Sequence, residues 1–154
     1  MSSAVAARIL LLIVWLLSAA AVAAQDLPVR IGAERFVLEV VDDPDARRQG
    51  LMGRTELAAN RGMLFDFPPG VTPSIWMRNM HIPLDLIYLD GDARITHLFE
   101  AVPPCKASPC TLYSADRPLR FVIEVPAGTV DRLGLEVGQQ VDLGGLEKQP
   151  QPQD

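Results

Sequence analysis

Residues 84–100 read LDLIYLDGDARITHLFE, and this stretch has the pattern of two strands joined by a short turn. Its first half, 84–90, is dense in branched and aromatic residues, which pack well on a pleated sheet. The pair Gly91-Asp92 then favours a tight turn, and 94–100 supplies a second strand. The stretch therefore predicts a β-hairpin, and the rest of the chain extends it into a β-rich domain.

Four further stretches have the pattern of strands. Apolar and polar side chains alternate at 34–41 and at 119–125, a period of two that separates the two faces of a sheet. Residues 62–67 form another strand, which ends at Pro68-Pro69-Gly70. We expect a last strand at 140–143.

Two short helices are predicted from signals at their ends. Asp43 can cap free N–H groups and Pro44 suits the first helical position, so a helix should run from Pro44 to about Gln49 and stop at Gly50. Residues 129–133 can form a helical turn closed by Gly134. The chain is thus predicted to be mainly β, a β-rich α+β fold with an antiparallel or mixed sheet and two short helices.

The N-terminus has the pattern of a secretory signal peptide at residues 1–24. Arg8 precedes the apolar run Ile9 to Leu17, and small residues follow as far as Ala24. The run is shorter than the roughly 20 apolar residues that a membrane-spanning helix needs. We expect cleavage after Ala23 or Ala24 and a periplasmic or extracellular protein; the alternative is an uncleaved membrane anchor.

The mature chain is predicted to be one domain, residues 25–146, followed by a polar, proline-containing tail at 147–154 that we expect to be disordered. It contains no further apolar run long enough to span a membrane. The chain has 14 basic and 19 acidic side chains, and loss of Arg8 with the leader leaves 13 − 19 = −6. This sign argues against nucleic acid, because a binder of phosphate backbones needs a basic surface.

Cys105 and Cys110 lie in the sequence PPCKASPC. A close pair of cysteines in an exported protein is typically a disulfide, and this one would pin a proline-rich loop. A redox-active pair is the alternative, but it favours the Cys-x-x-Cys spacing, which this pair lacks.

Several ordered motifs resemble those of the domain-of-unknown-function 192 family. They are RQGLMGR at 48–54, GMLF at 62–65, WMRNMHIPLD at 76–85 and FVIEVPAG at 121–128. The resemblance covers about residues 29–143 and implies a small, barrel-like β fold, found in bacterial and archaeal proteins that are often exported. It implies no established activity. The family commonly has Asn-Thr where this chain has Asn79-Met80, so a role that needs that hydroxyl is in doubt.

The motif at 76–85 suggests a candidate site, with two readings. In one, Asn79 and Asp85 bind backbone N–H groups and hold loops, while Trp76 fills the core. In the other, Trp76, Asn79 and Asp85 converge with Arg54 or Arg48 on a small polar ligand, because an arginine fork suits a carboxylate or phosphate. Pairing of Arg54 with Asp85 or Glu124 would look the same in sequence.

A soft metal site is a further possibility, because Met77, Met80 and His81 are close in sequence and suit Cu(I). Methionine is chiefly a flexible core residue, so we expect no metal and no cofactor. Neither of the two histidines, His81 and His97, belongs to a recognisable catalytic triad or zinc spacing.

The sequence leaves three classes of function open. The favoured one is binding of a small polar ligand or of an envelope protein. The second is a hydrolase acting on an envelope component, in which Asp85 and Glu124 could serve as acid and base if the fold joins them. The third is a structural or interaction module without a pocket.

Overall fold

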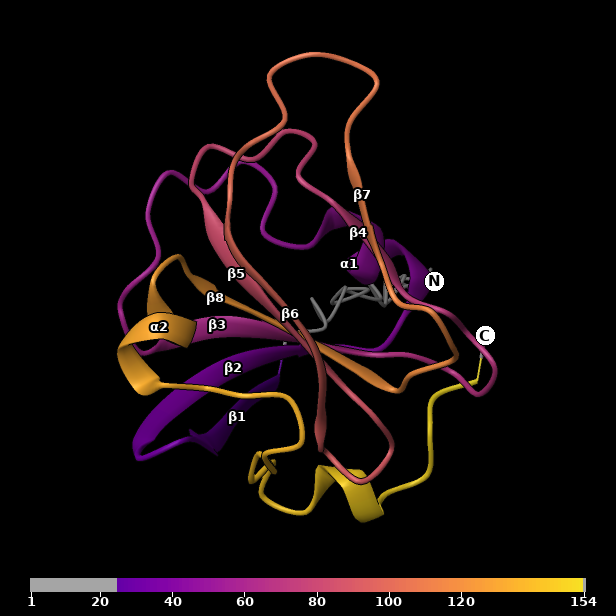
Figure 1. Ribbon diagram of the computed structural model, residues 1–154. Coiled ribbons are helices and arrows are strands. Elements are labelled where there is room, and N and C mark those ends of the chain that lie inside the picture. The colour runs from indigo at the N-terminus through magenta and orange to yellow at the C-terminus, as the bar shows by residue number, and fades with distance from the viewer. Residues whose placement is uncertain (1–24, 154) are drawn as a thin grey trace, which may run out of the picture.

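The structure is a computed structural model, and it describes residues 25–153 (Figure 1). Its main body is one six-stranded sheet, with the strand order β1-β2-β3-β8-β5-β6, and β4 and β7 form a separate two-stranded ribbon. In chain order the elements are β1 (Gln25–Ile31), β2 (Glu34–Val41), α1 (Pro44–Gln49), β3 (Arg61–Asp66), β4 (Ser74–Trp76), β5 (Leu84–Leu89), β6 (Ile95–Val102), β7 (Leu112–Ser114), β8 (Phe121–Pro126), α2 (Thr129–Leu133) and η1 (Leu146–Lys148).

The sheet is mixed, because β2 and β3 run parallel while every other neighbouring pair is antiparallel. A parallel pair needs a crossover connection, and the segment that contains α1 provides it. The prediction of a mainly β fold with two short helices is confirmed. The sheet is not a closed barrel, although single bridges from Asp142 to Arg30 and from Gln140 to Arg94 connect its two edges.

Two core clusters fill the two faces of the sheet, as a period of two requires. The first cluster contains Phe36, Leu38, Leu64, Ile87, Leu89, Phe121, Ile123 and Val125 from the strands, and Val130 and Leu135 from the region of α2. The second contains Met63, Phe65, Leu86, Tyr88 and Val122 from the strands, with Leu51, Ile75, Met77 and Met80 from the connecting segments. Helix α2 therefore covers one face, and α1 with the β4–β7 ribbon covers the other (Figure 1).

Both helices occur at the predicted residues. The side chain of Asp43 accepts hydrogen bonds from the N–H groups of Asp45 and Ala46, at 3.0 and 2.9 Å, and caps α1. Helix α1 ends at Gly50, and α2 ends at Gly134, which has a φ of 58°. These ends were predictable because the capping residues are adjacent to the helices that they begin or end.

The strands agree less well with the sequence analysis. Strands β2, β3, β5, β6 and β8 lie where strands were predicted, but β1, β4 and β7 were not predicted. The stretch 140–143 forms two isolated bridges instead of a strand. Its neighbours are the ends of two different strands, so it extends neither ladder by more than one residue.

Cys105 and Cys110 form a disulfide, with a Cα–Cα distance of 5.6 Å, so the predicted pairing is present in the structure. The bridge closes the loop between β6 and β7, and the N–H of Cys105 donates to the carbonyl of Met77 at 2.9 Å. The disulfide loop is thereby attached to the segment that follows β4.

The predicted leader, residues 1–24, lies outside the described residues. Within residues 25–153, no helix is long and apolar enough to cross a membrane. The C-terminal segment contains η1, and the carbonyl groups of Glu147 and Gln149 accept hydrogen bonds from the guanidinium of Arg120, at 3.1 and 3.0 Å. The predicted disorder of the tail at 147–154 concerns its motion in solution and stays a prediction.

Candidate functional site

Glu124 is the most unusual polar residue of the second core cluster's face. It lies on β8 between two apolar neighbours, Met63 on β3 and Leu86 on β5, which are its register partners across the sheet. Only 5% of the residue is exposed, and its buried Oε2 atom has no hydrogen-bond partner. A buried polar atom without a partner costs about 1–3 kcal/mol, so its presence calls for an explanation.

Burial raises the pKa of Glu124 from its ordinary value of 4.5 to about 8. The cause is desolvation, because the apolar surroundings cannot solvate a carboxylate. At neutral pH the side chain is therefore a neutral carboxylic acid, and a neutral acid can donate one O–H hydrogen bond.

Glu124 lines a cavity of 270 Å³, here called the inner cavity. Its walls are mostly apolar and come from α1 and the loop after it, from β3 and from β4, and they include Leu51, Phe65, Phe67, Ile75 and Met80. The volume is slightly below the range of about 300–1,000 Å³ that is typical of ligand sites. A mostly apolar cavity with one buried acid in its wall fits a small ligand that has an apolar body and a polar group for that acid.

Strand β3 approaches β8 closely because residue 62 is glycine. A Cβ atom at Gly62 would lie 2.3 Å from the carbonyl oxygen of Glu124 and 2.9 Å from Leu38. The missing side chain lets the two strands pair at the level of Glu124, whose backbone carbonyl a side chain at residue 62 would meet.

A second, more open cavity of 440 Å³, here called the outer cavity, adjoins the first. The two share four lining residues, which are Arg48, Gln49, Met52 and Trp76. The outer cavity adds Asp45, Arg78 and Asn79. The shared residues join the two cavities into one groove. Glu124 lines the inner part of this groove and not the outer part.

Charged groups gather where the groove opens. Arg48 forms an ion pair with Asp45 at 2.6 Å, and both side chains are largely exposed. The guanidinium carbon of Arg78 lies 5.4 Å from the centre of the Trp76 ring, which is a cation–π contact. Arg47, which lines the inner cavity, donates to the carbonyl of Asp66 at 3.1 Å and lies over the ring of Phe67.

The structure brings together some of the predicted site residues. Trp76 and Asn79 both line the outer cavity. Arg54 lines neither cavity, because its guanidinium forms two hydrogen bonds of 2.6 Å with the carboxylate of Glu39. Asp85 is fully buried and accepts from the N–H groups of Ala101 and Val130, at 2.7 and 2.8 Å.

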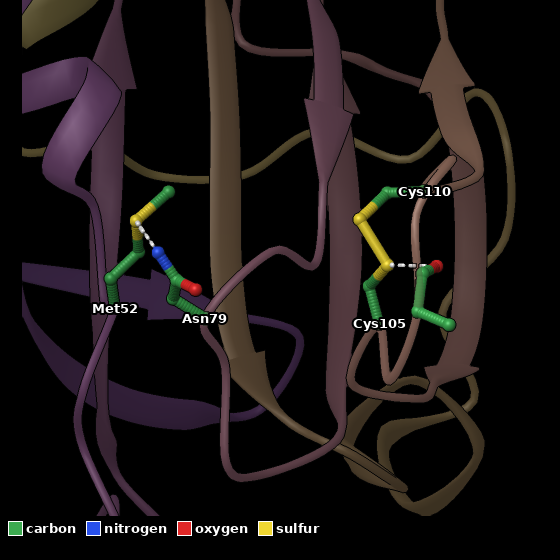
Figure 2. The surroundings of a disulfide bond; sticks show 5 residues. Met52, Asn79, Cys105 and Cys110 are labelled. Carbon is green, nitrogen blue, oxygen red and sulfur yellow. Dashed lines mark hydrogen bonds between the residues drawn. A yellow bond between two sulfur atoms is a disulfide. The ribbon is translucent and has the colours of Figure 1, made fainter.

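Asn79 contributes to local structure as well as to the cavity. Its φ of 57° is in the left-handed region, which asparagine tolerates better than most residues. Its side-chain amide donates to the sulfur of Met52 at 3.9 Å (Figure 2), and its backbone carbonyl accepts from the N–H of Gly53 at 3.0 Å. These contacts join the loop after α1 to the loop after β4, so Asn79 fixes one wall of the outer cavity.

Asp85 and Glu124 lie on opposite faces of the sheet. Asp85 is opposite Val125, and Glu124 is opposite Leu86, so the pleat directs the two carboxyl groups to different sides. Val125 belongs to the first core cluster and Leu86 to the second. The arrangement does not bring the two carboxyl groups together as the acid and base of one cleft.

The soft-ligand residues do not form an open cluster. Met77 and Met80 are buried in the second core cluster, whereas His81 is exposed. Among residues 25–153, no group of three or more histidine, cysteine, aspartate or glutamate side chains could hold a metal ion. Met80 contributes an apolar wall to the inner cavity.

Sequence reasoning named Glu124 only as a possible partner of Arg54 or as an acid or base with Asp85, and did not include it in the candidate ligand site. One signal was present: a glutamate interrupts the apolar run FVIEV at 121–125. The alternation of that strand allowed Glu124 to be an ordinary exposed residue, because a period of two does not tell which face is solvated. Its burial depends on α1 and β4, which lie far away in the sequence.

Three comparisons place the chain among known proteins. A family model, DUF192 with the description Uncharacterized ACR, matches residues 27–143. A crystal structure described as “a putative transcription regulator” from Sinorhizobium meliloti 1021 is 34% identical with a TM-score of 0.74, over 81% of this chain and 98% of that one. A protein of unknown function from Novosphingobium aromaticivorans DSM 12444 is 32% identical with a TM-score of 0.66, over 76% and 83%. No curated protein matches.

Proposed function

This chain belongs to the DUF192 family, and we propose that it binds a small ligand whose apolar body fills the inner cavity. A polar atom of this ligand accepts a hydrogen bond from the protonated carboxyl group of Glu124. The acceptor would be a neutral oxygen, such as that of an amide, a ketone or an ester. The observation that carries the proposal is the buried, unpartnered carboxyl group on the wall of a cavity.

The physical support is the cost of leaving that group alone. A hydrogen-bonding partner inside the cavity would offset the desolvation of Glu124, whereas a hydrophobic residue of similar size would avoid the cost altogether. Buried acids with a raised pKa and a cavity beside them are typical of functional sites. An anionic acceptor is less suited to the floor, because a second negative charge would meet the same apolar surroundings.

We propose further that the protein is exported. The support is the predicted leader at 1–24 and the Cys105–Cys110 disulfide, because such bridges persist in oxidising compartments. The name of the Sinorhizobium relative mentions transcription, but the acidic surplus of this chain, 19 acidic against 14 basic side chains, argues against a nucleic-acid ligand.

A protein partner in the cell envelope is a second candidate, favoured by one observation. Trp76 on β4 and Leu112 on β7 are register partners, and they are 39% and 60% exposed. Exposed apolar pairs of this kind are often covered by a partner. The small-ligand proposal is preferred because the same Trp76 also lines both cavities.

The test is a titration of the mature chain with hexanamide at about pH 6, in which NMR chemical shifts report binding. We expect the shifts to concentrate at the inner cavity. Glu124→Met, which removes the donor and keeps the length of the side chain, should weaken binding about tenfold. Glu124→Gln is the matched control, because it keeps a donor and should retain most of the affinity.

The pH dependence gives a second readout. Binding to the wild type should weaken above about pH 8, where Glu124 loses its proton, while Glu124→Gln should bind equally at both ends of the range. If Glu124→Met folds and binds hexanamide as tightly as the wild type, Glu124 is not the donor and the proposal fails.

A further inference from the structure

The outer cavity has a chemistry that a ligand of the inner cavity alone would leave unused. It contains the guanidinium groups of Arg48 and Arg78, one carboxylate, Asp45, and the amide of Asn79. The inner cavity, in contrast, is mostly apolar and ends at a neutral acid. The groove therefore has three zones, which are a cationic mouth, an apolar middle and a hydrogen-bond donor at the floor.

Arg78 is the part of this mouth that is most available to a ligand. Among residues 25–153 it forms no ion pair with a carboxylate, and its guanidinium carbon lies over the Trp76 ring in a cation–π contact. A cation–π contact does not use the N–H donors of the guanidinium as an ion pair would, so they remain available to a ligand. An arginine held in this way matches the planar fork of an oxyanion.

Arg48 is the second cation, and Asp45 limits its availability. The two side chains are 69% and 90% exposed, and an ion pair this exposed is weak, so an incoming anion can compete with Asp45. Both arginines belong to the outer cavity, and Arg48 also lines the inner one. With one acid and two guanidinium groups, the mouth of the groove has a net positive charge within an acidic protein.

We infer that the ligand is an amphipathic molecule with two polar ends: an oxyanion that binds at Arg78 and Arg48, an apolar body beside Trp76 and within the inner cavity, and a neutral acceptor that reaches Glu124. This inference rests on the proposed function and adds the class of ligand. A carboxylate and a phosphate share the necessary chemistry, because both offer paired oxygens to a guanidinium fork.

The experiment compares three ligands of similar length by titration at low ionic strength. Hexanamide has only the acceptor, adipic acid monoamide adds a terminal carboxylate, and the corresponding amide with a terminal phosphate replaces the carboxylate. We expect the anionic ligands to bind about fivefold more tightly than hexanamide, which is the gain that one partly exposed charge contact provides. The advantage should shrink at high ionic strength, because salt screens exposed charges.

Variants assign the gain to the mouth of the groove. Arg78→Gln should remove most of the anionic advantage, measured as the ratio of the affinities of one variant for the anionic amide and for hexanamide. Asp45→Asn should increase the advantage, because it releases Arg48 from its ion pair. The matched control is Arg35→Gln on the β1–β2 hairpin, which removes an exposed arginine that lines neither cavity and should leave the anionic advantage unchanged.

The outcomes separate the two proposals. If hexanamide binds in a Glu124-dependent way and the anions bind no better, the inference about the oxyanion is wrong while the proposed function stands. If Arg35→Gln reduces the advantage as much as Arg78→Gln, the effect belongs to the overall charge and the inference is also wrong. If hexanamide does not bind but an anion binds through Arg78, the proposed role of Glu124 fails. Where the anionic ligands bind more tightly than hexanamide, the one with the higher affinity shows whether the site prefers a carboxylate or a phosphate.

Discussion

At the scale of single residues, Glu124 links the stability of the protein to pH. Its pKa is about 8 in the folded protein and has the ordinary value of 4.5 when unfolded. Between these values the folded chain keeps a proton that the unfolded chain has lost, so the free energy of unfolding falls as pH rises. The stabilising contribution is complete below about pH 4.5 and is lost by about pH 8, a total of up to roughly 5 kcal/mol.

Glu124→Gln should therefore flatten the dependence of stability on pH. A glutamine is neutral throughout, so the variant should be more stable than the wild type at about pH 8 and differ little near pH 5. Denaturant unfolding at a series of pH values measures this difference, in which the contributions of all other groups cancel. Parallel curves for the two proteins would show that Glu124 is ionised in the fold.

The comparison of Asp85 with Glu124 shows how far single residues could be predicted. The reading of Asp85 as a residue that binds backbone N–H groups agrees with its contacts to Ala101 and Val130, because an acid beside a proline commonly has this role. The burial of Glu124 could not be predicted, since it depends on segments remote in sequence that cover its face of the sheet.

At the scale of elements, the close contact of β3 with β8 depends on Gly62. In Gly62→Ala the added Cβ would meet backbone, at 2.3 Å from the carbonyl oxygen of Glu124, so the two strands must separate. We expect a loss of about 1–3 kcal/mol in the free energy of unfolding, measured with denaturant.

Gly91→Ala provides the control for this substitution. No atom lies within 4 Å of a Cβ placed on Gly91, which is in the β5–β6 turn. Its effect on stability should be within about 0.5 kcal/mol. Equal effects of the two substitutions would mean that Gly62 affects stability only through chain entropy. The close approach of β3 and β8 would then contribute nothing to the loss of stability.

Elements differed in how well the sequence predicted them. Helix α1 was predicted with its bounds, because Asp43, Pro44 and Gly50 act locally. Strands β4 and β7 have three residues each, too few to show a period, and they exist because they pair with one another. Since β4 positions Trp76, the sequence could name this residue as a site candidate but could not build the cavities around it.

At the scale of the whole molecule, the C-terminal segment is attached to the sheet through Arg120. This buried guanidinium forms hydrogen bonds to the carboxylate of Asp66, at 2.9 and 3.1 Å, and to the carbonyls of Glu147 and Gln149. Deletion of residues 147–154 should lower the free energy of unfolding by about 2 kcal/mol, because these acceptors are lost.

A shorter deletion, of residues 152–154, keeps those acceptors and should leave stability unchanged. Denaturant unfolding of both truncated chains decides the matter, and backbone relaxation measured by NMR reports the motion directly. A neutral effect of the longer deletion would favour the tail as a disordered segment, as its composition predicts.

The topology of the sheet was the part of the fold that could not be predicted. The hairpin at 84–100 could be predicted because its two strands are joined by a short turn. The position of β8 between β3 and β5 is a contact between segments far apart in sequence, and no local pattern encodes it.

That central position of β8 has a consequence for the order of assembly. During synthesis the chain emerges from its N-terminus, so the group β1-β2-β3 and the hairpin β5-β6 are both complete before Phe121 leaves the ribosome. Until β8 arrives, β3 and β5 each keep an unpaired edge, which is the state in which strands associate with the wrong partners. The strand that carries Glu124 is therefore also the one whose late arrival joins two half-sheets into a single fold.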